Sequence, residues 1–214
     1  MKMIGFLSIV LLLSCQIQGS KLKGEAIEPS ATLASFQGKL DTATFAGGCF
    51  WCIEASFEQI EGVVEAISGY SGGEEKNADY KKVSAGYTKH AEAVQIYFDP
   101  TVIDFETLLD VFFTAHDPTQ LNRQGPDVGT QYRSEIFYHD EAQMELAKSK
   151  ISALQGKYGG KIVTKLSQLK AFYPAEEYHQ DFERKNPNNG YIRNVSKPKI
   201  DKVASEFSDL LKKE

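Results

Sequence analysis

The stretch TATFAGGCFWCIEASFEQIEG, residues 42–62, places a strand, a glycine break and a helix in immediate succession. Residues 42–46 predict a strand, which Gly47 and Gly48 interrupt. Beyond them, apolar side chains recur at three- and four-residue steps with glutamates on other faces, which is typical of an amphipathic helix ending at Gly62. The apolar set is Phe50, Ile53, Phe57 and Ile60.

Outside this unit, the chain continues to alternate between strand and helix patterns. The clearest strand is 91–98, and residues 117–132 predict a long loop of the kind that is often functional. The mixture predicts an α/β (α+β) domain in two layers, with a mixed sheet and flanking helices. The other predicted elements are strands at 63–70, 134–138 and 161–166, helices at 80–85, 105–115, 140–158 and 175–185, a loop at 186–198 and an amphipathic helix near the end.

The composition is that of one compact domain with short appendages, since 42% of the 214 residues are hydrophobic and 25% are charged. The formal net charge of −5 argues against a general nucleic-acid surface, because phosphate binding relies on clustered Lys and Arg. We expect a catalytic domain at 41–200, a terminal amphipathic helix at 201–214 and a monomeric protein.

The first residues have the organisation of an export signal. A basic start precedes the apolar run 4–13, which is too short to span a bilayer. The run ends in Leu12-Leu13-Ser14-Cys15, which resembles the lipobox of bacterial lipoproteins, where the Cys becomes the acylated first residue. We therefore expect a signal peptide at 1–14, a flexible tether at 15–40 and an exported, membrane-anchored lipoprotein with lipid on Cys15. Ordinary signal cleavage nearby is the alternative.

The cysteines favour redox chemistry. Of the three, lipidation of Cys15 leaves only Cys49 and Cys52, spaced as C-x-x-C. An exported domain with one such pair is not a disulfide-stapled scaffold. A zinc site would need further ligands, whereas the histidines at 90, 116, 139 and 179 are scattered. We expect neither a metal nor an organic cofactor, and packing of both thiols as small apolar groups is the structural alternative.

Cys49 falls at the start of the predicted helix, where free N–H groups and the helix dipole favour a negative sulfur. The thiolate is the nucleophilic form of cysteine. Cys52 follows one turn later on the same face. Between them, Phe50 belongs to the apolar stripe and favours core packing, whereas Trp51 lies off it and favours a substrate-facing apolar wall.

Glu92 lies on one face of the predicted strand 91–98 together with apolar residues. A carboxyl held there should have a raised pKa and donate a proton near neutral pH. A strand-end carboxylate that reaches solvent or a salt bridge is the alternative. By themselves, the residues of the loop 123–133 favour a solvated turn over a functional loop, and Tyr80 and Tyr132 are expected to be ordinary half-buried tyrosines.

Four blocks of sequence resemble, in order, the A-type peptide methionine sulfoxide reductases. They are GCFWC at 48–52, GYSGG at 69–73, HAEAV at 90–94 and the stretch 116–133. The resemblance covers about 44–190. It implies a two-layer α/β domain with a ferredoxin-like core, which reduces the S epimer of methionine sulfoxide, in proteins or free, to methionine.

The resemblance also implies roles for particular residues. Cys49 is then the nucleophile, Glu92 the proton donor, and Phe50 with Trp51 the pocket for the methyl group. The sulfoxide oxygen and the hydrogen bonding of the site fall to Tyr80, Asp127 and Tyr132.

One departure concerns the C-terminal region, where the usual resolving cysteines are absent because no Cys follows Tyr173. We expect instead a Cys49 sulfenic acid that condenses with Cys52 to a disulfide, which a thioredoxin-like dithiol reduces, in the repair of oxidised proteins. One rival is a thioredoxin-like disulfide oxidoreductase, in which Glu92 and Asp127 have no role. The other is a non-enzymatic lipoprotein that binds peptide or metal.

Overall fold

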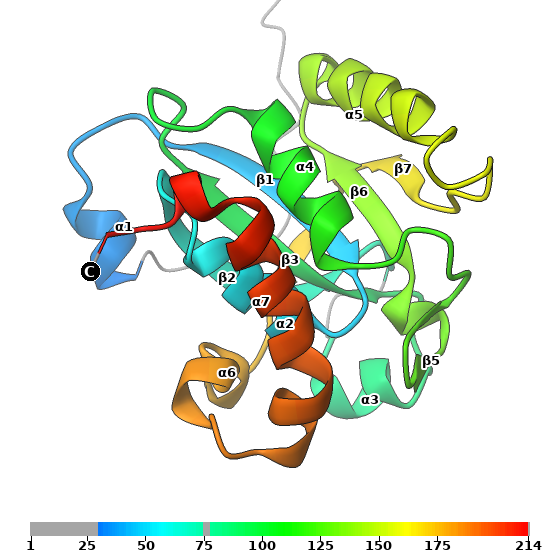
Figure 1. Cartoon of the computed structure of the whole chain (residues 1–214). Coiled ribbons are helices and arrows are strands. Elements are labelled where there is room, and N and C mark those ends of the chain that lie inside the picture. Colours follow the sequence, from blue (N-terminus) through cyan, green and yellow to red (C-terminus); the bar gives the residue numbers. More distant parts are fainter. Residues whose placement is uncertain (1–29, 75–77, 214) are drawn as a thin grey trace, which may run out of the picture.

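The computed structural model describes residues 30–74 and 78–213, and its centre is a six-stranded sheet in the order β7-β6-β1-β3-β2-β8 (Figure 1). All neighbouring strands are antiparallel except β6 and β7, which are parallel. The strands are β1 Asp41–Gly47, β2 Val63–Ser71, β3 Ala91–Phe98, β6 Ser134–Tyr138, β7 Lys165–Gln168 and β8 Phe172–Pro174.

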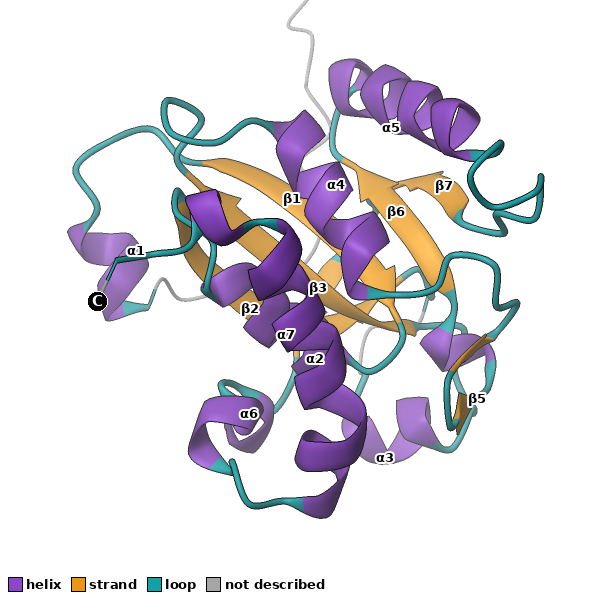
Figure 2. Cartoon of the chain, viewed as in Figure 1, coloured by secondary structure: helices purple, strands orange, loops and turns teal. Residues whose placement is uncertain are grey.

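Helices surround the sheet. Figure 2 shows α2 and α4 on one face, with α7 lying across them. The helices are α1 Ala31–Ser35, α2 Phe50–Glu58, α3 Tyr80–Ser84, α4 Phe105–Ala115, α5 Glu141–Leu154, α6 Phe182–Lys185 and α7 Lys197–Glu206. Shorter elements are the hairpin β4 Arg123–Gln124 and β5 Asp127–Val128, the turns Thr130–Tyr132, Glu177–His179 and Ser208–Leu210, and a π-helical turn at Ile192–Ser196.

The chain order β1-α2-β2-β3-α4-β6 and the spatial order β6-β1-β3-β2 together give a ferredoxin-like core. This confirms the mixed two-layer domain. β1 lies at its centre, where Phe45 pairs with Val94 of β3 on one side and with Ile136 of β6 on the other. Because α2 follows β1 directly, its first turn is fixed at the end of a strand that pairs with β3 along its first part and with β6 along its last part.

The core between the sheet and α2 and α4 is aromatic. The ring of Phe45 stacks on Phe57 with centroids 5.6 Å apart and on Phe112 at 4.8 Å. All three side chains are fully buried, so truncating one to alanine should cost about 3–5 kcal/mol. On the other face of the sheet, Phe137 and Phe172 form a smaller cluster against which Leu33 of α1 packs.

Side-chain caps begin several of the helices. Asp79, Asp104 and Asp140 each accept the backbone N–H three residues ahead, which satisfies a donor that the helix leaves free. At α2, the cap residue is Cys49, whose side chain makes no such bond. The start of α2 is therefore the helix N-terminus that presents a sulfur in place of a capping oxygen.

The structure differs from the sequence expectations at several places. The segment expected to be a tether contains α1, which contacts β2, and Ser30 bonds Glu65. The strand expected at 161–166 lies at Lys165–Gln168, because the chain turns through Gly159 and Gly160 at positive φ and then crosses past Pro118.

Two further differences lie near the C-terminus. The expected helix 175–185 is divided at Asp181, which has φ 53°. The expected loop 186–198 contains the π-helical turn, and α7 begins at Lys197 with Pro198 in its first turn, where a fixed φ suits a helix. Cys15, with the expected signal peptide and most of the tether, lies outside the described residues, and within the described ranges no helix is both long and apolar enough to span a bilayer.

Candidate active site

Glycines before α2 bring Cys49 close to the loop that carries β4. Gly48 has φ +96°, and a Cβ there would lie 2.5 Å from the Cβ of Gln124. Only glycine fits this close approach without displacing the loop. The Gln124 side chain bonds back to the backbone of Asp117, so the loop is tied down beside the sulfur.

Cys49 and Cys52 are free, buried thiols that hydrogen-bond to each other. Cys49 has φ −59° and ψ 125°, so it lies just outside the helix, and the N–H of Cys52 donates to its carbonyl oxygen at 3.2 Å. The sequence expectation placed Cys49 at the start of the helix and Cys52 one turn later on the same face. The backbone at Cys49 is instead non-helical, and the two thiols are hydrogen-bonded to each other.

The charge of the pair differs from the sequence expectation. Burial, followed by the hydrogen bond to Cys52 and nearby negative charge, raises the pKa of Cys49 well above its ordinary value. The bond from Cys49, with the charge of Lys199 and the Ser196 hydroxyl, lowers the pKa of Cys52 to about 7. The two pKa shifts have opposite directions, so within the pair a thiolate is favoured on Cys52 over Cys49. Position at a helix start is outweighed here by desolvation.

Glu92 points inward from β3, as its place in the strand predicts. Its carboxylate oxygen Oε2 accepts the N–H of Phe50 at 3.1 Å, and its exposed fraction is 2%. Burial raises the pKa of Glu92 to about 8, although the bond from Phe50 opposes the shift. The carboxyl is therefore largely protonated at neutral pH and holds a transferable proton beside the thiol pair.

The structure brings Tyr80, Asp127 and Tyr132 to the same place. Burial and the charges of Glu92 and Cys49 raise the pKa of Tyr80 to about 12. Burial and the charge of Glu92 also raise the pKa of Tyr132. Both hydroxyls are therefore neutral donors at physiological pH, and half-buried positions leave them accessible to a ligand.

Tyr191 belongs to this site, although no sequence pattern indicates it. Its hydroxyl donates to Oδ2 of Asp127 at 2.5 Å and also bonds to the sulfur of Cys49, where it lowers the pKa of the thiol. Tyr191 directly precedes the π-helical turn Ile192–Ser196, in the segment expected to be a loop. A contact between such distant parts of the chain leaves no local signal.

Phe50 and Trp51 form an aromatic cluster with residues from α6 and the turn before it. Phe50 is buried, with its ring centroid 5.1 Å from that of His179. Trp51 is half-buried and stacks on Phe182 with centroids 3.8 Å apart, while its Nε1 donates to Nδ1 of His179 at 3.2 Å. The expected division into a core phenylalanine and a more exposed tryptophan agrees with this burial. His179 and Phe182 were not anticipated from the sequence.

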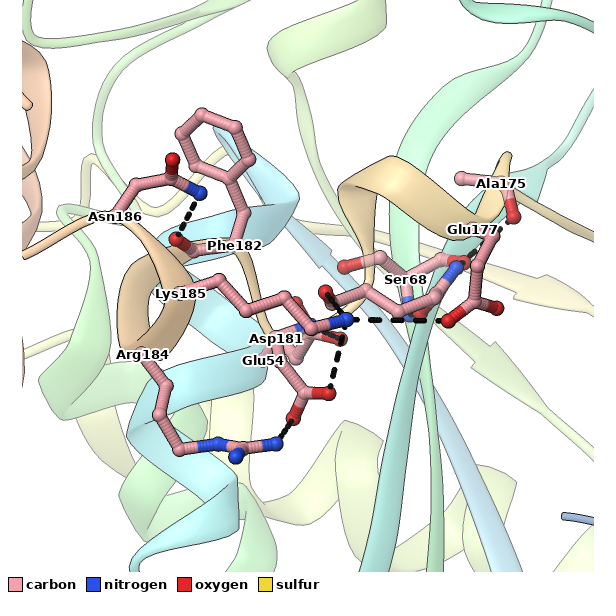
Figure 3. Close-up of polar contacts among 10 residues, drawn as sticks. Glu54, Ser68, Ala175, Glu177, Asp181, Phe182, Arg184, Lys185 and Asn186 are labelled. Atoms are coloured by element: carbon pink, nitrogen blue, oxygen red, sulfur yellow. Dashed lines mark hydrogen bonds and ion pairs between the residues drawn. The ribbon is translucent and has the colours of Figure 1, made fainter.

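The segment that carries His179 and Phe182 is held against β2 and α2 (Figure 3). Oε1 of the buried Glu54 accepts the N–H of Asp181 at 3.2 Å. The side chain of Gln180 bonds to the N–H of Ser68 at 2.9 Å and to its carbonyl oxygen at 3.0 Å. Burial raises the pKa of Glu54 to about 8. These bonds fix the aromatic wall next to Trp51.

Comparison with known proteins agrees with this geometry. Residues 41–211 match the family model described as peptide methionine sulfoxide reductase. Peptide methionine sulfoxide reductase MsrA of Natronomonas pharaonis is 52% identical over 170 residues, which cover 78% of this chain and 96% of that protein.

Solved structures are similar as well. Mxr1 from Saccharomyces cerevisiae in reduced form has a TM-score of 0.68 and 40% identity, covering 79% of this chain and 94% of that one. The same yeast protein in complex with Trx2 has a TM-score of 0.50 and 30% identity, covering 76% and 94%. Since the family model and the relatives cover most of the chain at such identities, the protein belongs to the peptide methionine sulfoxide reductase family, among the MsrA enzymes, and is an oxidoreductase.

Proposed function

We propose that this enzyme reduces the S epimer of methionine sulfoxide, in proteins or free, through Cys49, Glu92 and Cys52. The observation that carries the proposal is the hydrogen bond between Phe50 and Glu92, because it places a protonated carboxyl at the first turn of the helix that Cys49 caps. A nucleophile and a proton donor then face the same substrate atom pair, the sulfur and the oxygen of the sulfoxide.

In the first step, the sulfur of Cys49 attacks the sulfoxide sulfur while Glu92 protonates the departing oxygen. The bond between Cys49 and the substrate sulfur then breaks as the oxygen passes to Cys49. A thiol and a sulfoxide have thus become a sulfenic acid and a thioether, and methionine is released. The proton that leaves Cys49 replaces the one that Glu92 donates, so no net charge accumulates in this step.

The surrounding side chains orient the substrate. Trp51, held by Phe182 and His179, provides the apolar wall for the methyl group, and Phe50 closes the floor beneath it. The hydroxyls of Tyr80 and Tyr132 donate to the sulfoxide oxygen. Asp127 acts through Tyr191, whose hydroxyl it fixes beside the attacking sulfur.

In the second step, Cys52 attacks the sulfenic sulfur of Cys49, water leaves and a disulfide forms. The two thiols are already hydrogen-bonded to each other, so the attacking sulfur starts beside its target. A thioredoxin-like dithiol then reduces the disulfide by exchange, in keeping with the Trx2 complex of yeast Mxr1. This cycle uses neither a metal nor an organic cofactor.

We also propose that the protein is exported and anchored through lipid on Cys15, as the sequence Leu12-Leu13-Ser14-Cys15 favours. Two acyl chains anchor a protein where one binds only marginally. Mass analysis of the mature N-terminus tests this. Diacylglyceryl cysteine at position 15 supports the proposal, whereas cleavage elsewhere or an unmodified Cys15 contradicts it.

The test of the catalytic proposal is an assay with the two epimers of a methionine sulfoxide peptide and a thioredoxin system as reductant. Methionine should form from the S epimer and not from the R epimer. The Cys49→Ser variant is the matched control, since it keeps the shape of the site without the nucleophile. Equal rates on both epimers, or activity in Cys49→Ser, would contradict the proposal.

A further inference from the structure

Cys52 is held from the C-terminal part of the chain as well as by Cys49. Its Sγ lies 3.1 Å from Oγ of Ser196, the last residue of the π-helical turn, and its exposed fraction is 1%. α7 follows directly and contacts α2. A hydroxyl that accepts from a thiol rotates to donate to a thiolate, so Ser196 suits either state of Cys52.

Lys199 lies one helical turn beyond Ser196, on the same face of the helix. Its Nζ is buried and has no hydrogen-bond partner among residues 30–74 and 78–213. A buried ammonium without a partner destabilises a fold, and an anion that forms beside it relieves that cost. The charge of Lys199 acts on Cys52, since it contributes to lowering the pKa of that thiol after the bond from Cys49.

Other charged groups near Cys52 do not take this role. The charge of Asp127 opposes a thiolate at Cys52. His116 also lies near Lys199, but burial lowers the pKa of His116 to about 4, so it is neutral and adds no charge. Ser196 and Lys199 are thus the groups of the C-terminal segment that favour an anionic Cys52 sulfur.

We propose that Ser196 and Lys199 are positioning residues that stabilise Cys52 as the leaving thiolate when an external dithiol reduces the Cys49–Cys52 disulfide. The inference rests on the proposed catalytic cycle. The partner thiolate attacks Cys49, the bond between the two sulfurs breaks, and the electron pair leaves on Cys52. The second thiol of the partner then displaces Cys49 from the mixed disulfide, and the two protons of the partner dithiol end on the enzyme cysteines.

Two effects decide which sulfur of the disulfide the partner thiolate attacks: how exposed each cysteine is, and how readily the other leaves as a thiolate. Cys49 has an exposed fraction of 6% against 1% for Cys52, and the side of Cys52 that faces α7 is occupied by Ser196. A thiol that is more readily held as thiolate also leaves faster. Both effects make Cys49 the sulfur that receives the partner.

The experiment follows reduction of the oxidised full-length enzyme by thioredoxin with rapid mixing, in the parent and in Lys199→Met, Lys199→Arg and Lys197→Met. Lys197 is the matched control, because it belongs to the same helix but is exposed and paired with Asp201 at 2.8 Å. A neighbouring charge shifts a thiol pKa by about 1–3. With a coefficient for the leaving thiol of the same order as that of an attacking thiol, about 0.4–0.5, Lys199→Met should slow reduction about 3- to 30-fold. Lys199→Arg should restore most of the rate and Lys197→Met should retain it.

Two further measurements separate this role from a structural one and from failure of the catalytic cycle. Methionine release in a first turnover without reductant should be unchanged in Lys199→Met, and its melting temperature should not fall, since an unpaired buried charge is removed. A thioredoxin without its second cysteine should be trapped on Cys49. Parental reduction rates in Lys199→Met, an equal slowing of methionine release, or trapping on Cys52 would overturn the inference, whereas loss of methionine formation in the parent would refute the cycle itself.

Discussion

The N–H of Phe50 donates to the Glu92 carboxyl group at 3.1 Å, so the first turn of α2 is bonded to an acid of β3. Glu92 therefore accepts an N–H group at this helix start, whereas the Cys49 side chain makes no capping bond there. The bond joins the two elements that carry the candidate nucleophile and the candidate acid. It also opposes the effect of burial, which raises the pKa of Glu92 to about 8. The proton is therefore held at neutral pH and released a little above it.

The first prediction concerns the rate of reduction. Glu92→Gln keeps the shape of the side chain but has no acidic proton, so single-turnover methionine formation should slow by about 10²- to 10⁴-fold. In the parent, the same rate should fall as the pH rises through about 8, where Glu92 loses its proton. Rapid-quench kinetics across pH measure both effects, and a parental rate in the variant near neutral pH would remove Glu92 from the mechanism.

The second prediction concerns the stability of Glu92→Gln, which should increase relative to the parent even though its rate of reduction decreases. The folded protein holds a proton on Glu92 up to a pKa of about 8, whereas an unfolded chain releases it near the ordinary value of 4.5. Between these two pH values, the free energy of unfolding of the parent falls by up to about 1.4 kcal/mol per pH unit. Glu92→Gln has no titrating group at this position and does not show this fall. In thermal unfolding, the melting temperature of the variant should therefore rise relative to that of the parent as the pH increases from 5 to 8. A constant difference over that range would contradict the raised pKa.

Local patterns predicted the elements that position the site, because they depend on residues near one another in sequence. β3 at Ala91–Phe98 and the start of α2 at Phe50 follow from side-chain periodicity and from glycine breaks. Tyr191, by contrast, reaches Cys49 through a turn that the sequence suggested was a loop. The raised pKa of Cys49 was also not predicted, because the desolvation that causes it depends on all the groups packed around the sulfur.

The third prediction tests Tyr191, which bonds to Asp127 and to Cys49. Tyr191→Phe removes a contact that lowers the pKa of Cys49, so that pKa rises and methionine formation near neutral pH should fall about tenfold for each unit of the rise. Tyr87→Phe is the control, because Tyr87 is 83% exposed. Stopped-flow measurement of the first turnover gives the comparison, and equal rates in the two variants would show that Tyr191 does not assist the sulfur.

The fourth prediction assigns the resolving step to Cys52. No other cysteine follows Cys49 in the chain, so Cys52→Ser should release one methionine per molecule and then stop when thioredoxin is the only reductant. A small thiol, which reduces a sulfenic acid directly, should restore turnover. Sustained turnover of Cys52→Ser with thioredoxin alone would refute the resolving role while leaving Cys49 as the nucleophile.

In the proposed cycle, Cys49 is oxidised by the sulfoxide and then forms a disulfide with Cys52. Mass spectrometry of the parent after a single turnover with an S-epimer sulfoxide peptide, without reductant, measures this directly. We expect one methionine per enzyme molecule and a peptide in which Cys49 and Cys52 are joined by a disulfide. Methionine formed while both thiols remain free, or a Cys49 that reacts with none of the substrate, would contradict it.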